Sequence, residues 1–186
     1  MKLELYYPAK PYEVTQAFGI LNPSYNQFGF TRHNGIDFRV DADGIVRAMC
    51  DGYVYDVGFN NGAGNYVRYH TLKPVEAEGR TGTVAFMYMH AKENLVKVGQ
   101  EVKAGDAIMV ADNTGFSTGP HTHISAYFIN ELYEKIDGNP ETDHCFDFSK
   151  YYNGLYSDSI IEGLNDQIRG LMFAIIAILK KKLGIT

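Results

Sequence analysis

Cysteine is scarce in this chain of 186 residues, which holds only Cys50 and Cys145, in no CxxC arrangement. Neither a disulfide framework nor a thiolate metal site is expected, and both cysteines are predicted to be ordinary thiols. Basic residues are also few, with 17 Lys and Arg against 22 Asp and Glu. A formal net charge of −5 argues against the broad basic surface that nucleic-acid backbones require, so no nucleic-acid partner is expected.

Long apolar runs are absent too. The longest extends from Leu171 to Leu179, about half of the roughly 18 residues that a membrane-spanning helix needs. In the first ten residues, Lys2, Glu4 and Pro8 interrupt any apolar stretch of the kind that a secretory signal contains. The chain as given is therefore expected to have neither a transmembrane span nor a classical signal peptide.

Short apolar runs separated by turn residues fill most of the chain. Between residues 12 and 130, segments such as 52–57 and 65–69 are rich in Val and Tyr, and Gly, Asn and Asp separate such segments. This pattern is typical of short strands joined by turns, and segment 96–106 continues it. The polar stretch 72–83 is expected to form a hairpin loop. We predict a mainly β, mostly antiparallel domain over residues 1–135, with its core at about 14–128.

The sequence changes character after residue 130. Residues 136–158 form a connecting segment rich in Tyr and Asp, and residues 159–183 are predicted to form an amphipathic helix. Its apolar residues follow the a/d spacing of heptads: Ile161, Leu164, Ile168, Leu171, Ile175 and Ile178. This stripe could pack on the β domain, on a second copy of the chain, or in a membrane interface. Residues 164–186 carry four basic side chains and one acidic one, which keeps the membrane alternative open.

A set of histidines and one aspartate forms the strongest functional signal. Its members are His33 with Asp37, His90, and His121 with His123. Alternate residues of a β-strand point to one face, so His121 and His123 are expected to project together, one binding a metal and the other facing its water. Gly35 is expected to allow a sharp turn that lets His33 and Asp37 converge.

Two imidazoles and one carboxylate suit catalytic zinc, with water in the fourth position, so the predicted cofactor is Zn²⁺. Zinc lowers the pKa of such a water toward about 7 and polarises a scissile carbonyl. A neighbouring imidazole must then accept the water's proton. His90 and His121 are the candidates for this role, and either could also donate a hydrogen bond to the oxyanion of the transition state.

Three segments together resemble the lysostaphin and LytM-type zinc endopeptidases: Arg32–Phe38, Tyr88–His90 and Ser117–His123. The resemblance extends over about residues 14–128 and includes Phe18-Gly19 and Gly64–Val67. It implies an antiparallel β-sheet domain of the LytM/lysostaphin type, a duplicated hybrid motif. The family's members hydrolyse peptide bonds of bacterial cell-wall peptidoglycan in a groove between a sheet and its flanking loops.

The resemblance also assigns roles to the histidine set. It implies that His33, Asp37 and His123 bind the metal, and that His90 and His121 orient the water and stabilise the transition state. The expected function is therefore that of a zinc metalloendopeptidase whose substrate is a peptidoglycan peptide.

The chain departs from the family pattern at a few positions. Where members commonly read His-Leu-His-Phe-Glu, this chain has His121-Thr122-His123-Ile124-Ser125, and we expect altered packing without loss of zinc. Many members carry a tyrosine in the loop that matches residues 59–64, where Asn61 or its neighbours stand here. His70 matches a non-catalytic histidine of the family. His144 lies near Asp143 and Cys145, where a solvated loop is favoured over a second metal site.

Two other functions are compatible with parts of the pattern. One is a non-catalytic wall-binding or hydrolase-regulating module of the same fold. The other is a sugar-phosphotransferase carrier domain, which His33–Asp37 and the hairpin at 98–106 also resemble. An enzyme acting on the wall without a signal segment needs another route to it, such as a phage particle or host lysis. The predicted helix is then a candidate for self-association or for docking to a virion or membrane surface.

Overall fold

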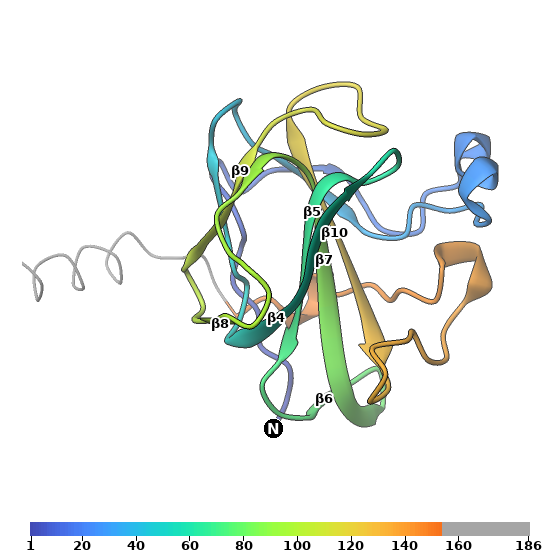
Figure 1. Ribbon diagram of the computed structural model, residues 1–186. Coiled ribbons are helices and arrows are strands. Elements are labelled where there is room, and N and C mark those ends of the chain that lie inside the picture. The colour runs from blue at the N-terminus through green and yellow to red at the C-terminus, as the bar shows by residue number, and fades with distance from the viewer. Residues whose placement is uncertain (154–186) are drawn as a thin grey trace, which may run out of the picture. The chain divides into compact units, whose positions relative to one another are not determined.

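The structure is a computed structural model, and it describes residues 1–153. In this part of the chain ten β-strands follow one another (Figure 1). They are β1 (Val14–Gln16), β2 (Ile36–Arg39), β3 (Ile45–Arg47), β4 (Gly52–Asn60), β5 (Gly64–Thr71), β6 (Val75–Ala77), β7 (Arg80–Asn94), β8 (Glu101–Val102), β9 (Ala107–Ala111) and β10 (His121–Ile129). Three 3₁₀ helices accompany them, η1 (Pro23–Phe28), η2 (Pro140–Thr142) and η3 (Ser149–Tyr151). The predicted helix 159–183 lies outside the described residues. Within 1–153, no helix is long and apolar enough to cross a membrane.

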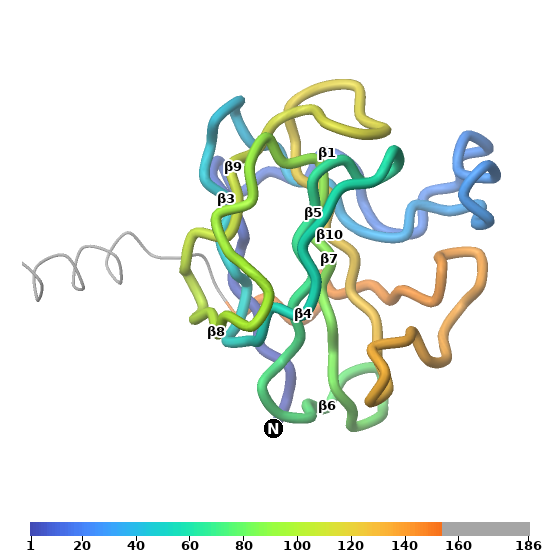
Figure 2. Tube along the Cα trace, in the orientation of Figure 1, coloured from blue at the N-terminus to red at the C-terminus, as the bar shows by residue number. Residues whose placement is uncertain are grey.

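The strands form one sheet whose main path is β1-β2-β10-β7-β5-β4-β8. All pairs between these named strands are antiparallel, which confirms the predicted mainly β, antiparallel fold. The long strand β7 also pairs with β6 at its beginning and with β9 at its end, and β9 pairs with β3. Figure 2 shows β3 and β9 beside each other, next to the stack of β4, β5, β7 and β10.

Strand and turn positions follow the local sequence closely. The apolar segments 52–57 and 65–69 lie within β4 and β5, which pair from Gly52 opposite Thr71 to Asn60 opposite Gly64. The polar stretch 72–83 is a hairpin, as expected, but more of it is paired than a loop would be, because β6 and the start of β7 form a ladder. Glu78 and Gly79 turn between them with φ of 51° and 73°, as a two-residue hairpin requires.

Aromatic side chains dominate the core. Tyr69, Phe86 and Tyr88 are fully buried, each on a strand at the centre of the sheet. Burying a tyrosine hydroxyl costs free energy unless it is hydrogen-bonded. Here the Met49 backbone N–H donates to the hydroxyls of both Tyr69 and Tyr88, at 3.0 and 3.1 Å. The loop before β4 is thereby tied to the middle of the sheet.

Residues 136–153, most of the predicted connecting segment, pack on the β-sheet. Phe148 is fully buried against Phe38 and Phe86, with ring centroids 6.4 Å from each. The Phe146 N–H donates to the Ala126 carbonyl of β10, and the Asn153 N–H donates to the Leu5 carbonyl. The hydrophobic core therefore includes side chains from this segment.

Candidate metal centre

Strand pairing brings two of the predicted ligands together. In the ladder between β2 and β10, His123 lies directly opposite Asp37. His33 lies in the loop that precedes β2, three residues before Ile36, and its N–H donates to the Ile20 carbonyl. His121 and His123 are alternate residues of β10, so the predicted common face of these two histidines is present in the structure.

Gly35 matters for a different reason than the sequence suggests. Its φ is not positive, so no left-handed turn requires glycine there. Instead, a Cβ atom at this position would lie 2.3 Å from the Ile124 carbonyl oxygen and 2.5 Å from the Nε2 atom of His123. The absent side chain lets the His33 loop approach β10 closely.

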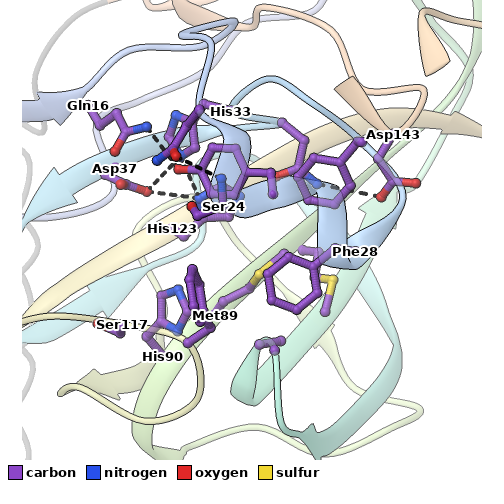
Figure 3. A pocket seen from close by; sticks show the side chains of 18 of the residues that line it. Gln16, Ser24, Phe28, His33, Asp37, Met89, His90, Ser117, His123 and Asp143 are labelled. Atoms are coloured by element: carbon purple, nitrogen blue, oxygen red, sulfur yellow. Dashed lines mark hydrogen bonds and ion pairs between the residues drawn. The ribbon is translucent and has the colours of Figure 1, made fainter. Parts of the chain in front are cut away.

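The three predicted ligands meet at one point (Figure 3). The Nε2 atom of His33 lies 2.9 Å from the Nδ1 atom of His123, and Asp37 Oδ1 lies 3.1 and 2.8 Å from these two atoms. All three side chains are buried. Within residues 1–153 they form the one His, Cys, Asp and Glu group whose ligand atoms could share an ion.

Hydrogen bonds orient both imidazoles for metal binding. His33 Nδ1 lies 2.8 Å from the Ala17 carbonyl, which can only accept, so the neutral ring carries its proton on Nδ1 and directs the Nε2 lone pair at the site. His123 Nε2 lies 3.0 Å from the Ser125 hydroxyl oxygen, which can accept a hydrogen bond from the Nε2–H group and leave the Nδ1 lone pair for the metal. With these tautomers, two lone pairs and a carboxylate oxygen converge, an arrangement that a cation stabilises. The residues present thus fit a divalent metal.

Charge in the site favours an ionised Asp37. Burial alone raises the pKa of this carboxyl group, but the interactions with His123 and His33 outweigh burial and hold the pKa well below its ordinary value. Burial lowers the pKa of His123, although Asp37 opposes this effect. A carboxylate beside neutral imidazoles is the protonation state that metal binding needs.

The two other predicted histidines lie beside this cluster. The ring centroids of His90 and His121 are 4.8 Å apart, and His121 Nε2 is 3.8 Å from Asp37 Oδ1. Backbone carbonyls hold the Nδ1 atoms of both rings, at 2.8 Å each, from Thr114 to His90 and from Gly119 to His121. The Nε2 atom of each neutral ring therefore has a lone pair available to water or substrate.

His90 is unusual in two respects. Its φ of 69° lies in the left-handed region, which few non-glycine residues adopt, and it lies where the β5–β7 pairing is irregular. Burial is the main cause that lowers the pKa of His90 from 6.5 to about 4, and the neighbouring His123 and His121 add to this effect. At neutral pH this imidazole is uncharged and can accept a proton.

The five predicted site residues all line a groove of about 420 Å³. Its apolar walls include Phe28, Phe30 and Phe116, with Met87 and Met89 of β7 between them. In Figure 3, Phe28 and Met89 lie near the histidines, and Asp143 lies toward the other end. A concave, partly apolar groove beside a metal cluster suits an extended peptide.

The groove does not include Asn61, His70 or His144, three further residues that the sequence singled out. Asn60 lines the groove and its Oδ1 atom accepts from the N–H groups of Gly62 and Ala63, whereas Asn61 does not line the groove. The exposed His144 is not a groove residue either. His70 packs among tyrosines, with ring centroids 5.7 Å from Tyr53 and from Tyr55.

Tyr25, in η1, is a groove residue that the sequence did not single out. Its ring stacks on His33 with centroids 5.8 Å apart, and its hydroxyl accepts from Gln16 Nε2 at 2.9 Å. Burial raises the pKa of the Tyr25 hydroxyl, so this group keeps its proton at neutral pH and can donate a hydrogen bond to a substrate oxygen. No local spacing links Tyr25 to the histidines, so sequence reasoning had no signal for it.

The segment around η2 contacts the loop that carries His33. The Thr31 and Arg32 N–H groups both donate to the Glu141 carbonyl, and Arg32 Nε lies 2.9 Å from the Glu141 carboxylate. Asn34, next to His33, lies 3.5 Å from Asp143. In Figure 1 the η1 loop and this segment lie on the same side of the sheet.

Curated relatives share the central part of the chain. It is 38% identical over 111 residues to an uncharacterized metalloprotease of Haemophilus influenzae, 57% of this chain and 22% of that protein. The glycyl-glycine endopeptidase ALE-1 of Staphylococcus capitis is 39% identical over 92 residues, 49% and 23% of the two chains. The peptidoglycan DD-endopeptidase ShyC of Vibrio cholerae is 31% identical over 110 residues, 59% and 22%. The chain thus spans about a quarter of the length of these relatives.

Solved structures of two peptidases are also similar to this chain. A zinc-containing peptidase from Vibrio cholerae has a TM-score of 0.55 and 29% identity, covering 68% of this chain and 36% of that one. The catalytic domain of lysostaphin from Staphylococcus simulans also has a TM-score of 0.55, with 26% identity over 73% and 87%. Residues 31–134, which contain all five predicted site residues, match peptidase family M23. The chain therefore belongs to peptidase family M23.

Proposed function

We propose that the protein is a zinc-dependent endopeptidase that hydrolyses peptide bonds in bacterial cell-wall peptidoglycan. The observation that carries the proposal is the convergence of the His33, Asp37 and His123 ligand atoms in a groove shared with His90 and His121. Family membership supports the metallopeptidase class. The names of ShyC and of the Vibrio cholerae structure support peptidoglycan as substrate and zinc as metal.

Each residue has a separate task in this proposal. His33 Nε2, His123 Nδ1 and the Asp37 carboxylate would hold the metal. Zinc, when bound, would polarise the scissile carbonyl and make water a stronger nucleophile. His90 Nε2 accepts a proton from the attacking water, because its lowered pKa keeps the imidazole neutral at pH 7. The ring of His121, whose centroid is 4.8 Å from that of His90, also orients that water.

The groove also positions the substrate. A peptide bound in an extended form would lie in the groove over Met87 and Met89 of β7 and beside His121 and His123 of β10. The Tyr25 hydroxyl then donates a hydrogen bond to the carbonyl oxygen as negative charge develops on it. The route by which the enzyme reaches the wall, including a phage-borne route, stays a prediction from sequence.

Metal analysis combined with digestion tests this function. We expect about one tightly held zinc per chain and release of fragments from defined peptidoglycans, identified by mass. Removal of the metal with a chelator should stop cleavage, and added zinc should restore it. Zinc-loaded protein that binds peptidoglycan and releases no fragment would instead identify a non-catalytic wall-binding module. Phosphohistidine formation without metal would identify a phosphotransferase carrier.

A further inference from the structure

Charged side chains are few in the groove, and most of them are already committed. In the described part of the chain, four Asp, Glu, Lys or Arg residues line it: Asp37, Arg68, Lys135 and Asp143. Asp37 belongs to the metal cluster. Lys135 forms an ion pair with Asp143, donates to the Asp143 carbonyl at 3.1 Å and lies 3.8 Å from Cys145 Sγ. Arg68 is the remaining cation.

Arg68 lies on the same face of the sheet as the metal cluster. On β5 it pairs with Met87 of β7, and Met87 pairs with Ser125 of β10, two residues after His123. Arg68 is thus two strands and one side-chain row from His123, a Cα separation of roughly 12 Å from standard strand dimensions. An extended peptide advances about 3.4 Å per residue, so Arg68 would face a substrate group about three to four residues from the scissile bond.

Three contacts hold the guanidinium group of Arg68 in place but do not use all of its N–H donors. Arg68 Nε donates to Met87 Sδ at 3.4 Å, Nη1 lies 3.4 Å from Asp56 Oδ2, and the group lies 5.1 Å from the centroid of the Tyr66 ring. These contacts engage two of the five N–H donors that an arginine carries. The side chain is 34% exposed and is one of the residues that line the groove.

The ion pair with Asp56 does not prevent the guanidinium group of Arg68 from binding a ligand carboxylate. The ion pair is long, the Asp56 side chain is 35% exposed, and Asp56 is not among the groove residues. Partly exposed ion pairs of this kind contribute little free energy, so a substrate carboxylate can compete for the guanidinium. A planar guanidinium matches a carboxylate better than any other cationic side chain does.

We propose that Arg68 is a specificity-determining residue that binds a free carboxylate of the substrate, about three to four residues from the bond that is cut. The proposal rests on the proposed function, because it assumes that a peptide occupies the groove. The protein then prefers peptides that carry a free carboxylate at this position over otherwise identical peptides in which that group is an amide.

The test uses two peptides that differ only in one carboxylate or carboxamide at this position. With the zinc-loaded full chain, we expect KM to be about 10-fold to 100-fold lower for the carboxylate peptide, the usual effect of one charge-assisted hydrogen bond. Arg68→Gln should raise KM for the carboxylate peptide to that of the carboxamide peptide, with kcat unchanged. Cleavage of the carboxamide peptide should be unaffected. Arg68→Lys should keep part of the preference.

Arg39→Gln is the matched control, because Arg39 also forms an exposed ion pair, with Glu13, but does not line the groove. It should behave like the unmodified protein. Thermal unfolding shows whether each variant is folded. Equal KM values for the two peptides in the unmodified protein, or a preference that survives in Arg68→Gln, would overturn the assignment.

Binding of uncleavable analogues separates this proposal from the proposed function. In these analogues the scissile amide is reduced to a methylene amine, and the carboxylate or carboxamide is kept. If no peptide is cleaved but the carboxylate analogue binds 10-fold or more tightly and loses this advantage in Arg68→Gln, the peptidase function fails and the carboxylate site stands. If peptides are cleaved and the analogues bind equally, the peptidase function stands and the carboxylate site is wrong.

Discussion

His123 on β10 lies directly opposite Asp37 on β2, and its Nδ1 atom is 2.8 Å from Asp37 Oδ1, although the two residues are 86 positions apart. The distance between these ligands is therefore set by the register of one strand pair. A shift of one residue would turn His123 to the opposite face of the sheet. Metal binding and formation of the β2–β10 ladder are consequently coupled.

Replacing any one ligand should release the metal. We expect His33→Ala, Asp37→Ala and His123→Ala each to lose zinc and hydrolysis, because a three-ligand site cannot lose one ligand and keep its geometry. Zinc content per folded chain is the measurement. His70→Ala is the control, since His70 lies outside the groove and should leave zinc content unchanged. Full occupancy in any ligand variant would show that the residue is not a ligand.

The other two histidines should separate metal binding from turnover. His90→Ala and His121→Ala are expected to keep zinc while kcat falls by about 10²- to 10⁴-fold, the usual effect of removing a positioned acid–base group. Steady-state kinetics on a soluble wall peptide, with zinc measured on the same samples, provide the check. A variant that turns over normally would exclude its histidine from the mechanism.

Ser125 should tune zinc affinity without taking part in the reaction. Its hydroxyl lies 3.0 Å from His123 Nε2, so Ser125→Ala removes the group that orients this ligand. We expect zinc to bind about 10- to 100-fold more weakly, with kcat near normal at saturating zinc. Competition with a chromophoric chelator measures the affinity. The exposed Ser149 is the control, and Ser149→Ala should bind zinc normally. An unchanged affinity in Ser125→Ala would show that the contact has no role in metal binding.

The pKa of His90 predicts how stability depends on pH in the metal-free protein. The unfolded chain takes up a proton near pH 6.5, whereas folded His90 does so only near pH 4. The unfolded state therefore binds more protons between these values, and stability should fall as pH falls from 6.5 to 4. The loss from this group is at most about 3.4 kcal/mol, from a difference of about 2.5 pKa units at 1.36 kcal/mol per unit.

Urea unfolding in a chelator at several pH values measures this loss. His90→Gln removes the titrating group, so its stability should fall less steeply below pH 6.5 than that of the unmodified protein. Parallel curves for the two proteins would show that His90 does not have a lowered pKa.

The last 32 residues should be dispensable for the chemistry. All five site residues precede Ile124, and residues 1–153 form one compact unit. A chain ending at Gly154 should keep its zinc and cleave small soluble peptides, while its oligomeric mass, solubility or membrane association changes. Cleavage of intact walls is expected to drop if the removed segment tethers the enzyme to a surface. Loss of zinc or unfolding would place the predicted helix in the core of the β domain.

A chain that ends before residues 136–153 should be much less stable than the chain that ends at Gly154. A chain ending at Lys135 lacks Phe148, which packs on Phe38 and Phe86, and lacks Glu141, which contacts the loop that carries His33. Removing a fully buried phenylalanine alone costs about 3–5 kcal/mol, a large part of the stability of a small domain. We therefore expect this shorter chain to unfold at a much lower temperature than the chain that ends at Gly154.

The sequence by itself determined the mainly β fold and the members of the histidine set. Alternating apolar residues in segments such as 65–69 define strands locally, and the spacing of His121 and His123 places both on one face. These two features depend on neighbours in the chain, so a linear pattern suffices to predict them, whereas His33, Asp37 and His90 were assigned their roles through the resemblance to a known family.

Only the tertiary structure decided which groups meet across the groove. The contact of Ser125 with His123, the stacking of Tyr25 on His33 and the position of Arg68 in line with Met87 each depend on strand register or loop packing. Gly35 shows the same limit, because its role comes from the close approach of β10 and not from its own φ. Such contacts join residues far apart in the chain, and their geometry follows from the pairing of whole strands, which local periodicity does not encode.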